Sequence, residues 1–338
     1  MDIYRSWKMF SKIVKERNAD QIVLVTSFPL REKLHGEIEK IRKMVPSDLE
    51  IVLIPDGEKA KEWKSLGRIL TQFTMLYLTR KSLVIALGGG SVSDVVGLAC
   101  SIYKRGMAHI NVPTTLLAQV DASIGGKTAI NFLGHKNQLG TFHQPIAIFA
   151  IAKFLRKLNR EQFIDGLAEI IKAGFIKDYE IFDILVKQKI SELRKKPVVL
   201  ERLIQKAIAV KEHFVKQDFK DNGIRQALNF GHTLGHALEL KYSLSHGMAV
   251  LYGIFLELQV AEKLGFVSTT KMIILKEMFD LLGINFNCHK FKIDRKSILH
   301  DKKSFGDKIS FPVIDMLGEI KILKISIKEL IAALEKCN

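Results

Sequence analysis

The chain has 338 residues, of which 47% are hydrophobic and 26% are charged. That length exceeds what one hydrophobic core usually serves, so we expect two domains. The formal net charge of +16 fits a nucleic-acid binder, a Lys-rich solvated surface, or an enzyme with a small anionic substrate. The basic residues are spread along the chain without interleaved aromatic residues or a known nucleic-acid motif, which argues against nucleic acid.

The cysteines and the apolar stretches indicate the compartment. Cys100, Cys288 and Cys337 form no short CxxC pair, so a thiolate zinc site and a disulfide framework are excluded and a reducing compartment is favoured. Residues 1–20 carry no apolar core of a secretory signal. The most apolar late stretch, residues 248–261, is too short to cross a bilayer. We therefore expect a cytoplasmic protein with no membrane partner.

The first half of the chain alternates strand and helix patterns. Short β-branched runs at 21–26, 50–55 and 82–87 predict strands, each followed by a segment of helix length. Further strands are expected near 108–112 and 146–150. Continuous apolar strands between helices are typical of a parallel sheet covered on both faces. The sequence thus predicts an α/β domain over residues 1–151.

Beyond residue 152 the apolar residues recur at helical spacing. The predicted helices cover 161–177, 197–216, 226–240, 246–264 and 268–282. Few strand patterns occur here. The second domain, residues 152–338, is therefore predicted to be mostly α-helical.

A glycine turn follows the strand at 82–87. The sequence Gly88-Gly-Gly-Ser-Val-Ser-Asp94 leads into a helical pattern, so the backbone could approach a pyrophosphate at the start of the helix. The alternative is a tight turn in which Ser91 and Asp94 form a capping box. The acidic turn Asp56-Gly-Glu58, which could hold ribose hydroxyls, favours the nucleotide. In the standard dinucleotide-binding motif the acidic residue follows the glycine turn, whereas here the acidic turn precedes it. The domain is therefore not a standard Rossmann unit.

A polar block extends from Pro113 to Asn137. It contains two lysine-bearing glycine turns, Gly125-Gly-Lys127 and Gly134-His-Lys136. The alternative to a binding site is a surface hairpin with turn glycines, which would explain one of these turns. Two such turns within a dozen residues favour an anion site, since lysine binds phosphate and carboxylate well.

Histidines and a carboxylate in the second domain indicate a metal site. Glu169 and Lys172 share one helix face, and His232 and His236 are one helical turn apart. Two or three histidines with a carboxylate match an open catalytic zinc site, although a single histidine on an apolar helix is usually a satisfied core residue. Spacing alone names His232 and His236 as the paired ligands and does not separate His236 from His246.

Six motifs occur in a fixed order: GGGSVSD, VPTTLLAQVDASIGGKTAIN, GHKNQLGTFHQP, GLAEIIKAG, LNFGHTLGHALE and SHGMAV. Together they resemble the 3-dehydroquinate synthase family over roughly residues 50–320. The resemblance implies conversion of 3-deoxy-D-arabino-heptulosonate 7-phosphate to 3-dehydroquinate and phosphate, in the shikimate pathway of aromatic amino acid biosynthesis. The implied course is NAD-mediated transient oxidation, phosphate elimination, re-reduction and intramolecular aldol closure. It also implies one divalent metal, zinc or cobalt, and a homodimer.

The resemblance assigns residues as well. Residues 1–151 become an NAD-binding domain, and residues 152–338 a metal- and substrate-binding domain. The metal ligands are Glu169, His232 and His246. The catalytic and substrate-binding residues are Arg105, Asp121, Lys127, Asn137, Lys172, Lys211, Arg225, Asn229, His236 and one or both of Lys302 and Lys303. The nucleotide-binding residues are Asp56, Gly57, Glu58, Lys59, Ala60, Lys61, Gly90, Ser91, Val92, Ser93, Asp94, Thr114, Thr115, Lys127, Lys136, Phe154, Leu155, Arg156 and Lys157.

Two of these assignments need explanation, and three residues depart from the family's usual pattern. Arg105 matches an arginine that reaches the substrate phosphate across the dimer interface, and Lys136 serves either substrate or nucleotide. Ser91 and Ser93 depart from the family's glycine turn, and Lys157 stands where threonine is common. Two rival functions remain, another sugar-phosphate cyclase and a metal-dependent polyol dehydrogenase of the same architecture.

Overall fold

The computed structural model describes residues 2–266, 269–284, 291, 293, 304–305, 308–315 and 319–337. The chain forms two compact units, Met1–Leu158 and Asn159–Asn338. Within the described parts of the chain, no helix is both long and apolar enough to cross a membrane.

The first unit is built on a six-stranded sheet in which every neighbouring pair of strands is parallel. Its strands, in spatial order, are β1 (Asp2–Tyr4), β8 (Ala147–Phe149), β5 (Ala108–Pro113), β4 (Leu83–Gly88), β2 (Ile22–Ser27) and β3 (Leu49–Ile54). The five predicted strands and the predicted parallel sheet are confirmed. The three-residue edge strand β1 was not predicted, because it is too short to show a pattern.

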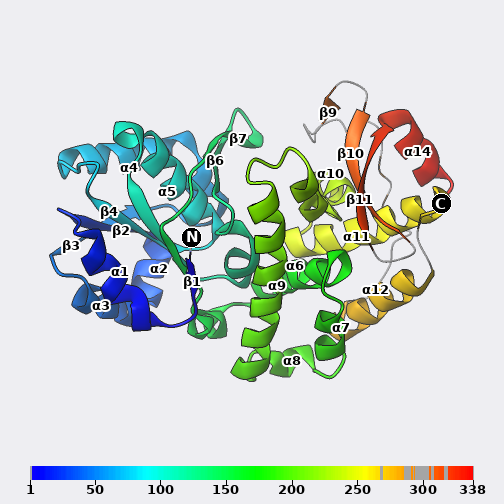
Figure 1. The fold of residues 1–338 in the computed structure, drawn as a ribbon, viewed down its shortest axis with the longest axis horizontal. Helices are drawn as coiled ribbons and strands as arrows, with labels where there is room; N and C mark the ends of the chain where they lie inside the picture. The colour runs from blue at the N-terminus through cyan, green and yellow to red at the C-terminus, as the bar shows by residue number, and fades with distance from the viewer. Residues whose placement is uncertain are drawn as a thin grey trace. The chain divides into compact units, whose positions relative to one another are not determined.

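Helices cover both faces of this sheet (Figure 1). Val23 and Val25 pack toward α4 (Trp63–Met75) and α5 (Gly90–Ile102), while Ile22 and Leu24 pack toward the opposite face. That opposite face is covered by α1 (Phe10–Arg17) and α3 (His35–Met44). Because successive side chains of a strand point to opposite faces, a fully apolar strand such as β2 serves two cores at once.

Shorter elements complete the first unit. They are α2 (Phe28–Lys33) and the short helical turns η1 (Trp7–Met9), η2 (Gly57–Lys61), η3 (Tyr103–Arg105), η4 (Ala118–Ala122) and η5 (Ala152–Lys157). The polar block forms an antiparallel hairpin of β6 (Lys127–Phe132) and β7 (His135–Phe142). Its turn residues Leu133 and Gly134 both have positive φ, 48° and 78°, as tight hairpin turns require. The hairpin interpretation is therefore correct for this segment, and it does not exclude an anion site.

The second unit is mostly helical. Its helices are α6 (Arg160–Ile176), α7 (Glu180–Leu185), α8 (Ile190–Leu193), α9 (Pro197–Gln217), α10 (His232–Tyr242), α11 (His246–Lys263), α12 (Thr269–Leu282) and α14 (Ile327–Glu335). The predicted helices are confirmed with one change. The segment expected at 226–240 begins as the 3-10 turn η6 (Ile224–Asn229), and α10 starts only after Gly231, whose φ is 80°.

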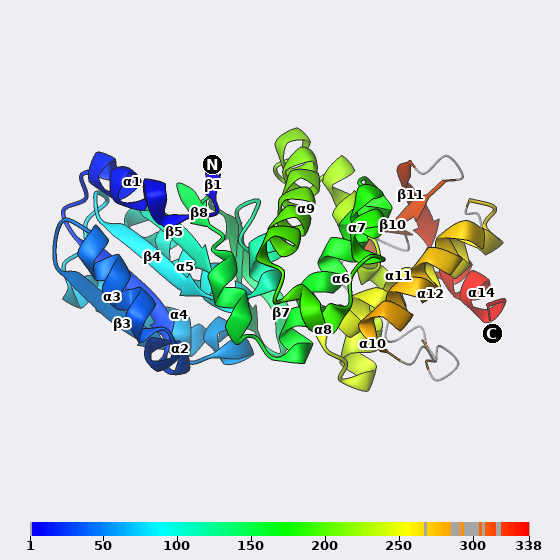
Figure 2. The ribbon, with the colours of Figure 1, turned by 90° about the horizontal axis from the view of Figure 1, so that it is seen from below.

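Helix α11 lies at the centre of this unit and packs against both α6 and α10, and Figure 2 shows its position from a second side. A three-stranded antiparallel sheet, β9 (Ser304–Phe305), β10 (Lys308–Ile314) and β11 (Ile320–Ser326), lies near α14. This small sheet was not predicted. The signal that could have found it is the run of isoleucine and leucine from 320 to 325, broken only by Lys321 and Lys324, since β-branched residues favour strands.

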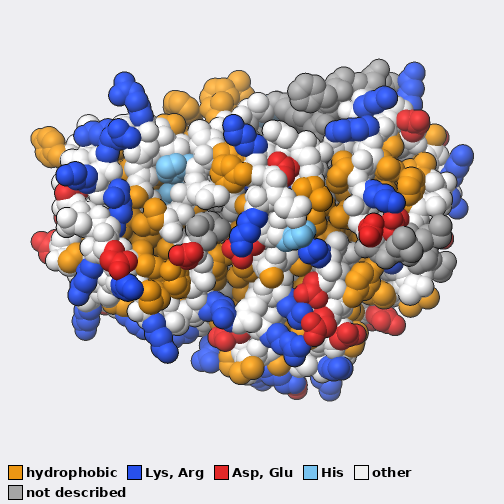
Figure 3. Space-filling view, viewed as in Figure 1, with side chains coloured by type: hydrophobic (Ala, Val, Ile, Leu, Met, Phe, Trp, Pro, Cys, Tyr) orange, Lys and Arg blue, Asp and Glu red, His pale blue; other side chains and the backbone are white. Residues whose placement is uncertain are grey.

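The positive charge is dispersed. On the face shown in Figure 3, Lys and Arg side chains are scattered, with acidic side chains among them, and they form no single continuous patch.

Candidate metal and nucleotide sites

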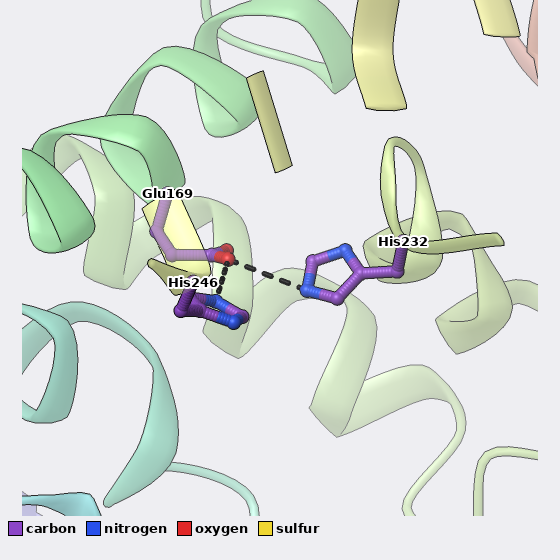
Figure 4. Close-up of side chains that lie close together, drawn as sticks. All are labelled: Glu169, His232 and His246. Atoms are coloured by element: carbon purple, nitrogen blue, oxygen red, sulfur yellow. Dashed lines mark hydrogen bonds and ion pairs between the residues drawn. The ribbon is translucent and has the colours of Figure 1, made fainter. Parts of the chain in front are cut away.

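Three side chains far apart in the sequence converge in the second unit (Figure 4). Glu169 comes from the middle of α6, while His232 and His246 are the first residues of α10 and α11. The Oε1 atom of Glu169 lies 3.0 Å from Nε2 of His246 and 3.4 Å from Nε2 of His232. One ligand atom from each residue lies within 4.8 Å of the other two. His236, by contrast, places its ring edge-on to His232, with 5.3 Å between ring centroids.

The protonation of His232 suits a metal ligand. Its Nδ1 lies 3.2 Å from the carbonyl oxygen of Phe230. A hydrogen on Nδ1 would donate to this carbonyl and leave the lone pair of Nε2 free for a metal. Burial, together with the nearby Lys172 ammonium, lowers the pKa of His232 to about 3. The imidazole is therefore neutral at pH 7.

The carboxylate between the histidines is ionised. Glu169 and Lys172 form an ion pair, and their side chains are only 2% and 4% exposed. Burial raises the pKa of Glu169, but the Lys172 charge and the contacts with His232 and His246 outweigh it and hold that pKa well below its usual value. Nε2 of His232 and Nε2 of His246 thus lie 3.4 Å and 3.0 Å from one anionic oxygen, an arrangement that a bound cation would stabilise.

These residues fit a divalent metal. Ligand atoms of a tetrahedral ion bound at about 2.0–2.2 Å lie about 3.3–3.6 Å apart, close to the separations found here. One carboxylate and two imidazoles leave a fourth position for substrate or water, as catalytic zinc sites do.

Other predicted residues of the second unit lie on η6, α9 and α10. Arg225 is buried in η6, where its backbone N–H donates to Asp218 at 3.2 Å. Asn229 ends η6, and His236 stands one turn into α10. Lys211 is half-buried on α9. Lys302 and Lys303 lie outside the described residues.

In the first unit, the glycine turn lies where β4 and β5 end. A Cβ at Gly88 would lie 2.5 Å from Val92, and one at Gly90 would lie 2.8 Å from Ala122, so close packing requires both glycines. Helix α5 begins at Gly90 after the N-cap Gly89, with no side-chain cap. The capping-box interpretation of Ser91 and Asp94 is therefore wrong, and the first N–H groups of α5 have no capping side chain.

The threonine pair adjoins this turn. The N–H of Thr114 donates to the carbonyl of Gly88 at 2.9 Å, and a Cβ on Gly89 would lie 3.3 Å from the methyl group of Thr115. Predicted nucleotide contacts from two separate motifs thus meet at the carboxyl ends of neighbouring parallel strands. Such an edge is the usual ligand site of open α/β sheets.

A polar network joins the acidic turn to α5 and the hairpin. The ammonium of Lys61 donates to Asp94 at 2.5 Å and also to the side-chain oxygen of Asn137. The amide of Asn131 donates to Glu58 at 2.6 Å and accepts from the backbone N–H of Asn137 at 2.9 Å. Asn131 was not among the predicted residues, although it ends the motif VPTTLLAQVDASIGGKTAIN.

The remaining predicted residues of this unit lie on separate elements and differ in exposure. Asp121 lies half-buried in η4, and Arg105, Lys127 and Lys136 are exposed. Within η5, the side chains of Phe154 and Leu155 are buried, and Phe154 packs in the sheet core. Lys157 is engaged elsewhere, since its ammonium donates to the carbonyl of Lys33 at 2.6 Å. Lys157, which stands where threonine is common in the family, thus uses its ammonium group to hold the segment of Lys33.

A parallel α/β unit with a glycine turn at its strand ends, followed by a helical unit with a carboxylate and two imidazoles, defines a class of two-domain enzymes. Within that class, sequence profiles of the 3-dehydroquinate synthase N-terminal and C-terminal domains match residues 51–165 and 166–304. The chain belongs to the 3-dehydroquinate synthase family.

Individual relatives agree. The 3-dehydroquinate synthase of Dictyoglomus thermophilum is 38% identical over 84% of this chain and 82% of its own length. That of Dictyoglomus turgidum is 35% identical over 99% of this chain and 94% of its own length.

Solved structures share the fold. A 2-epi-5-epi-valiolone synthase from Streptomyces hygroscopicus, with NAD+ and Zn²⁺ bound, matches with a TM-score of 0.86 at 23% identity, covering 99% of this chain and 96% of the other. A 2-deoxy-scyllo-inosose synthase complexed with carbaglucose-6-phosphate, NAD+ and Co²⁺ matches at 0.84 and 21% identity, with the same coverage.

Proposed function

We propose that this protein is a 3-dehydroquinate synthase that converts 3-deoxy-D-arabino-heptulosonate 7-phosphate to 3-dehydroquinate and phosphate. Family membership across both domains supports the assignment. The observation that carries it is the convergence of Glu169, His232 and His246 beside the buried ammonium of Lys172.

In this proposal Glu169, His232 and His246 hold one divalent metal, zinc or cobalt, and the first unit holds NAD. When bound, the metal supplies a Lewis acid for the substrate hydroxyls and NAD supplies a reversible hydride acceptor. The chain's own residues support the arrangement: Lys172 keeps Glu169 ionised, and the carbonyl of Phe230 would accept the Nδ1 hydrogen of His232, which leaves Nε2 free for the metal.

The substrate carries a carboxylate and a phosphate, for which we propose cationic and amide side chains as contacts. They are Lys127, Asn137, Lys172, Lys211, Arg225 and Asn229, with Asp121 accepting from a hydroxyl. His236, one turn beyond His232, would take up and return a proton during the reaction. We propose Lys302 or Lys303 as a further contact.

The nucleotide would lie against the glycine turn. The N–H groups at the start of α5, residues Gly90 to Asp94, would bind its pyrophosphate, and the carboxylates of Asp56 and Glu58 its ribose hydroxyls. Thr114 and Thr115 border the same turn. Lys136 serves either the nucleotide or the substrate.

We further propose a cytoplasmic homodimer. Arg105 is exposed in η3, where Lys104 and Arg105 both have positive φ, 47° and 66°. An arginine held out on such a turn would reach the phosphate in the site of the second copy.

The test is phosphate release from 3-deoxy-D-arabino-heptulosonate 7-phosphate by purified protein, with and without NAD and a chelator. Release should require catalytic NAD and stop with the chelator, and no NADH should accumulate. Accumulating NADH would instead indicate a polyol dehydrogenase. No release from folded, metal-loaded, NAD-supplied protein would reject the proposal, and other sugar phosphates should then be assayed in the same way.

A further inference from the structure

Both histidines of the metal site stand at the first position of a helix. His232 begins α10 and His246 begins α11. The first N–H groups of a helix have no partners within it, and the helix end carries a partial positive charge. Two such ends beside a divalent cation accumulate positive charge. Negative groups other than the ligand Glu169 would stabilise this arrangement.

Glu257 supplies one such group for α10. Its side chain lies on α11 and is completely buried. Its Oε2 accepts from the N–H of Gly231 at 2.7 Å, and its Oε1 accepts from the N–H of Leu234 at 3.1 Å. These two N–H groups lie on either side of His232 in the sequence. Both carboxylate oxygens of Glu257 therefore hold the turn from which His232 projects.

Asp165 makes the equivalent contact with α11. It stands on α6, one helical turn before Glu169. Its Oδ1 accepts from the N–H of Gly247, the residue after His246, at 2.7 Å. A Cβ on Gly247 would lie 2.5 Å from the Cα of Asp165, so the two backbones are in direct contact. The three helices that carry the ligands are thus linked in series, α6 to α11 and α11 to α10.

The packing of α10 on α11 leaves little freedom for another arrangement. A Cβ on Gly253 would lie 1.9 Å from the carbonyl oxygen of Gly231, and one on Gly235 would lie 2.7 Å from that of Ala249. Glycines therefore allow the two helices to approach closely. At that distance, the hydrogen bonds of Glu257 determine how the first turn of α10 is oriented.

We propose that Glu257 and Asp165 are positioning residues of the metal site. They hold the first turns of α10 and α11 so that the imidazoles of His232 and His246 face Glu169, and they offset the positive helix ends. The inference rests on the proposed metal site. Groups that orient metal ligands typically change metal affinity 10- to 100-fold when they are replaced.

The test compares Glu257→Gln with Glu262→Gln. Glutamine at 257 keeps the size but turns an NH2 group toward one backbone N–H and removes the charge. Glu262 is exposed on the same helix, so its substitution removes the same charge far from the hydrogen bonds at issue. The chelator-treated proteins are titrated with Co²⁺, and binding is followed by visible absorption. Melting temperatures are measured with and without Co²⁺.

We expect Glu257→Gln to bind Co²⁺ at least about tenfold more weakly than the parent, and Glu262→Gln to match the parent within about twofold. The Co²⁺-induced rise in melting temperature should also shrink in Glu257→Gln. A merely structural residue would lower both melting temperatures equally and leave the Co²⁺ affinity unchanged. Asp165→Asn should act in the same direction. Because Asp165 is only half-buried, that variant decides the matter if Glu257→Gln does not fold.

The possible failures are distinct. Parent-like Co²⁺ affinity in Glu257→Gln and Asp165→Asn would overturn the positioning role and leave the metal assignment intact. A parent protein that binds no Co²⁺ would overturn the metal assignment, and the positioning role with it.

Discussion

Replacing Lys172 with methionine should destabilise the metal-free protein much more than the metal-bound one. Lys172 and Glu169 form a buried ion pair on α6, with side chains 4% and 2% exposed. Methionine keeps the length of the side chain but leaves the Glu169 carboxylate buried beside His232, whose pKa burial lowers even without the lysine. Removing one partner of a buried ion pair costs about 3–5 kcal/mol of unfolding free energy.

A divalent metal would restore the missing positive charge at Glu169. The stability of Lys172→Met should therefore approach that of the parent when Co²⁺ saturates the site. A ligand that stabilises the variant more than the parent must also bind the variant more tightly. If Co²⁺ restores most of the lost ~3–5 kcal/mol, its affinity should rise about 10²- to 10³-fold. Turnover should be lost, because the ammonium is part of the proposed substrate site.

Urea unfolding of chelator-treated and Co²⁺-saturated protein measures both quantities. Lys263→Met, at an exposed lysine on α11, is the matched control and should leave the stabilisation by Co²⁺ unchanged. Equal losses of stability with and without Co²⁺ in Lys172→Met would refute the electrostatic reasoning. Full turnover in that variant would remove Lys172 from the site.

Three further predictions concern separate parts of the chain. His246→Ala should lose Co²⁺ retention during dialysis, and a metal content equal to the parent's would refute its role as a ligand. Asn131→Asp keeps an acceptor for the N–H of Asn137 but places a second carboxylate against Glu58. The dissociation constant for NAD, measured by calorimetry, should therefore rise about tenfold, which corresponds to about 1.4 kcal/mol. An unchanged dissociation constant would argue that this polar network does not support the nucleotide site. Burial, and secondarily His143, lowers the pKa of His109 to about 3, so the unfolded chain takes up this proton near pH 6.5 while the folded protein does not. Stability should fall from pH 6.5 toward pH 3, by about 3 kcal/mol at pH 4.5, and unfolding curves of His109→Phe should lack this loss. Identical pH dependence of the two proteins would contradict the prediction.

The sequence predicted most of the fold wherever burial is continuous. Strands such as β2 and β4 are buried at every position, so an unbroken apolar run sufficed to locate them. Five helices of the second unit, α6 and α9 to α12, were found because their apolar residues repeat at helical spacing, whereas α7, α8 and α14 were not predicted. The edge strand β1 and the sheet of β9 to β11 were missed, since short or half-exposed strands rely on pairing partners that are distant in sequence.

The site was predicted less completely, because its geometry arises where helices begin. The spacing of His232 and His236 suggested a ligand pair on one helix face. In the structure the candidate ligand atoms that meet belong to Glu169 and to the first residues of two other helices, and sequence spacing does not show that two helix starts converge. The resemblance to a family, rather than periodicity, had singled out His246.

Glu257 shows where reasoning from residue patterns stops. Glu169 and Glu257 both stand within apolar helical segments, and both are buried. Their sequence signals are therefore nearly the same: a carboxylate where a core residue is expected. What separates them is the group that each one faces. Beside its ion pair with Lys172, Glu169 faces two imidazole nitrogens, as a metal ligand would, whereas Glu257 accepts from two backbone N–H groups at the start of a helix. A buried acid in a helix thus signals a polar partner, and only the tertiary structure tells whether that partner is a metal site or a helix end.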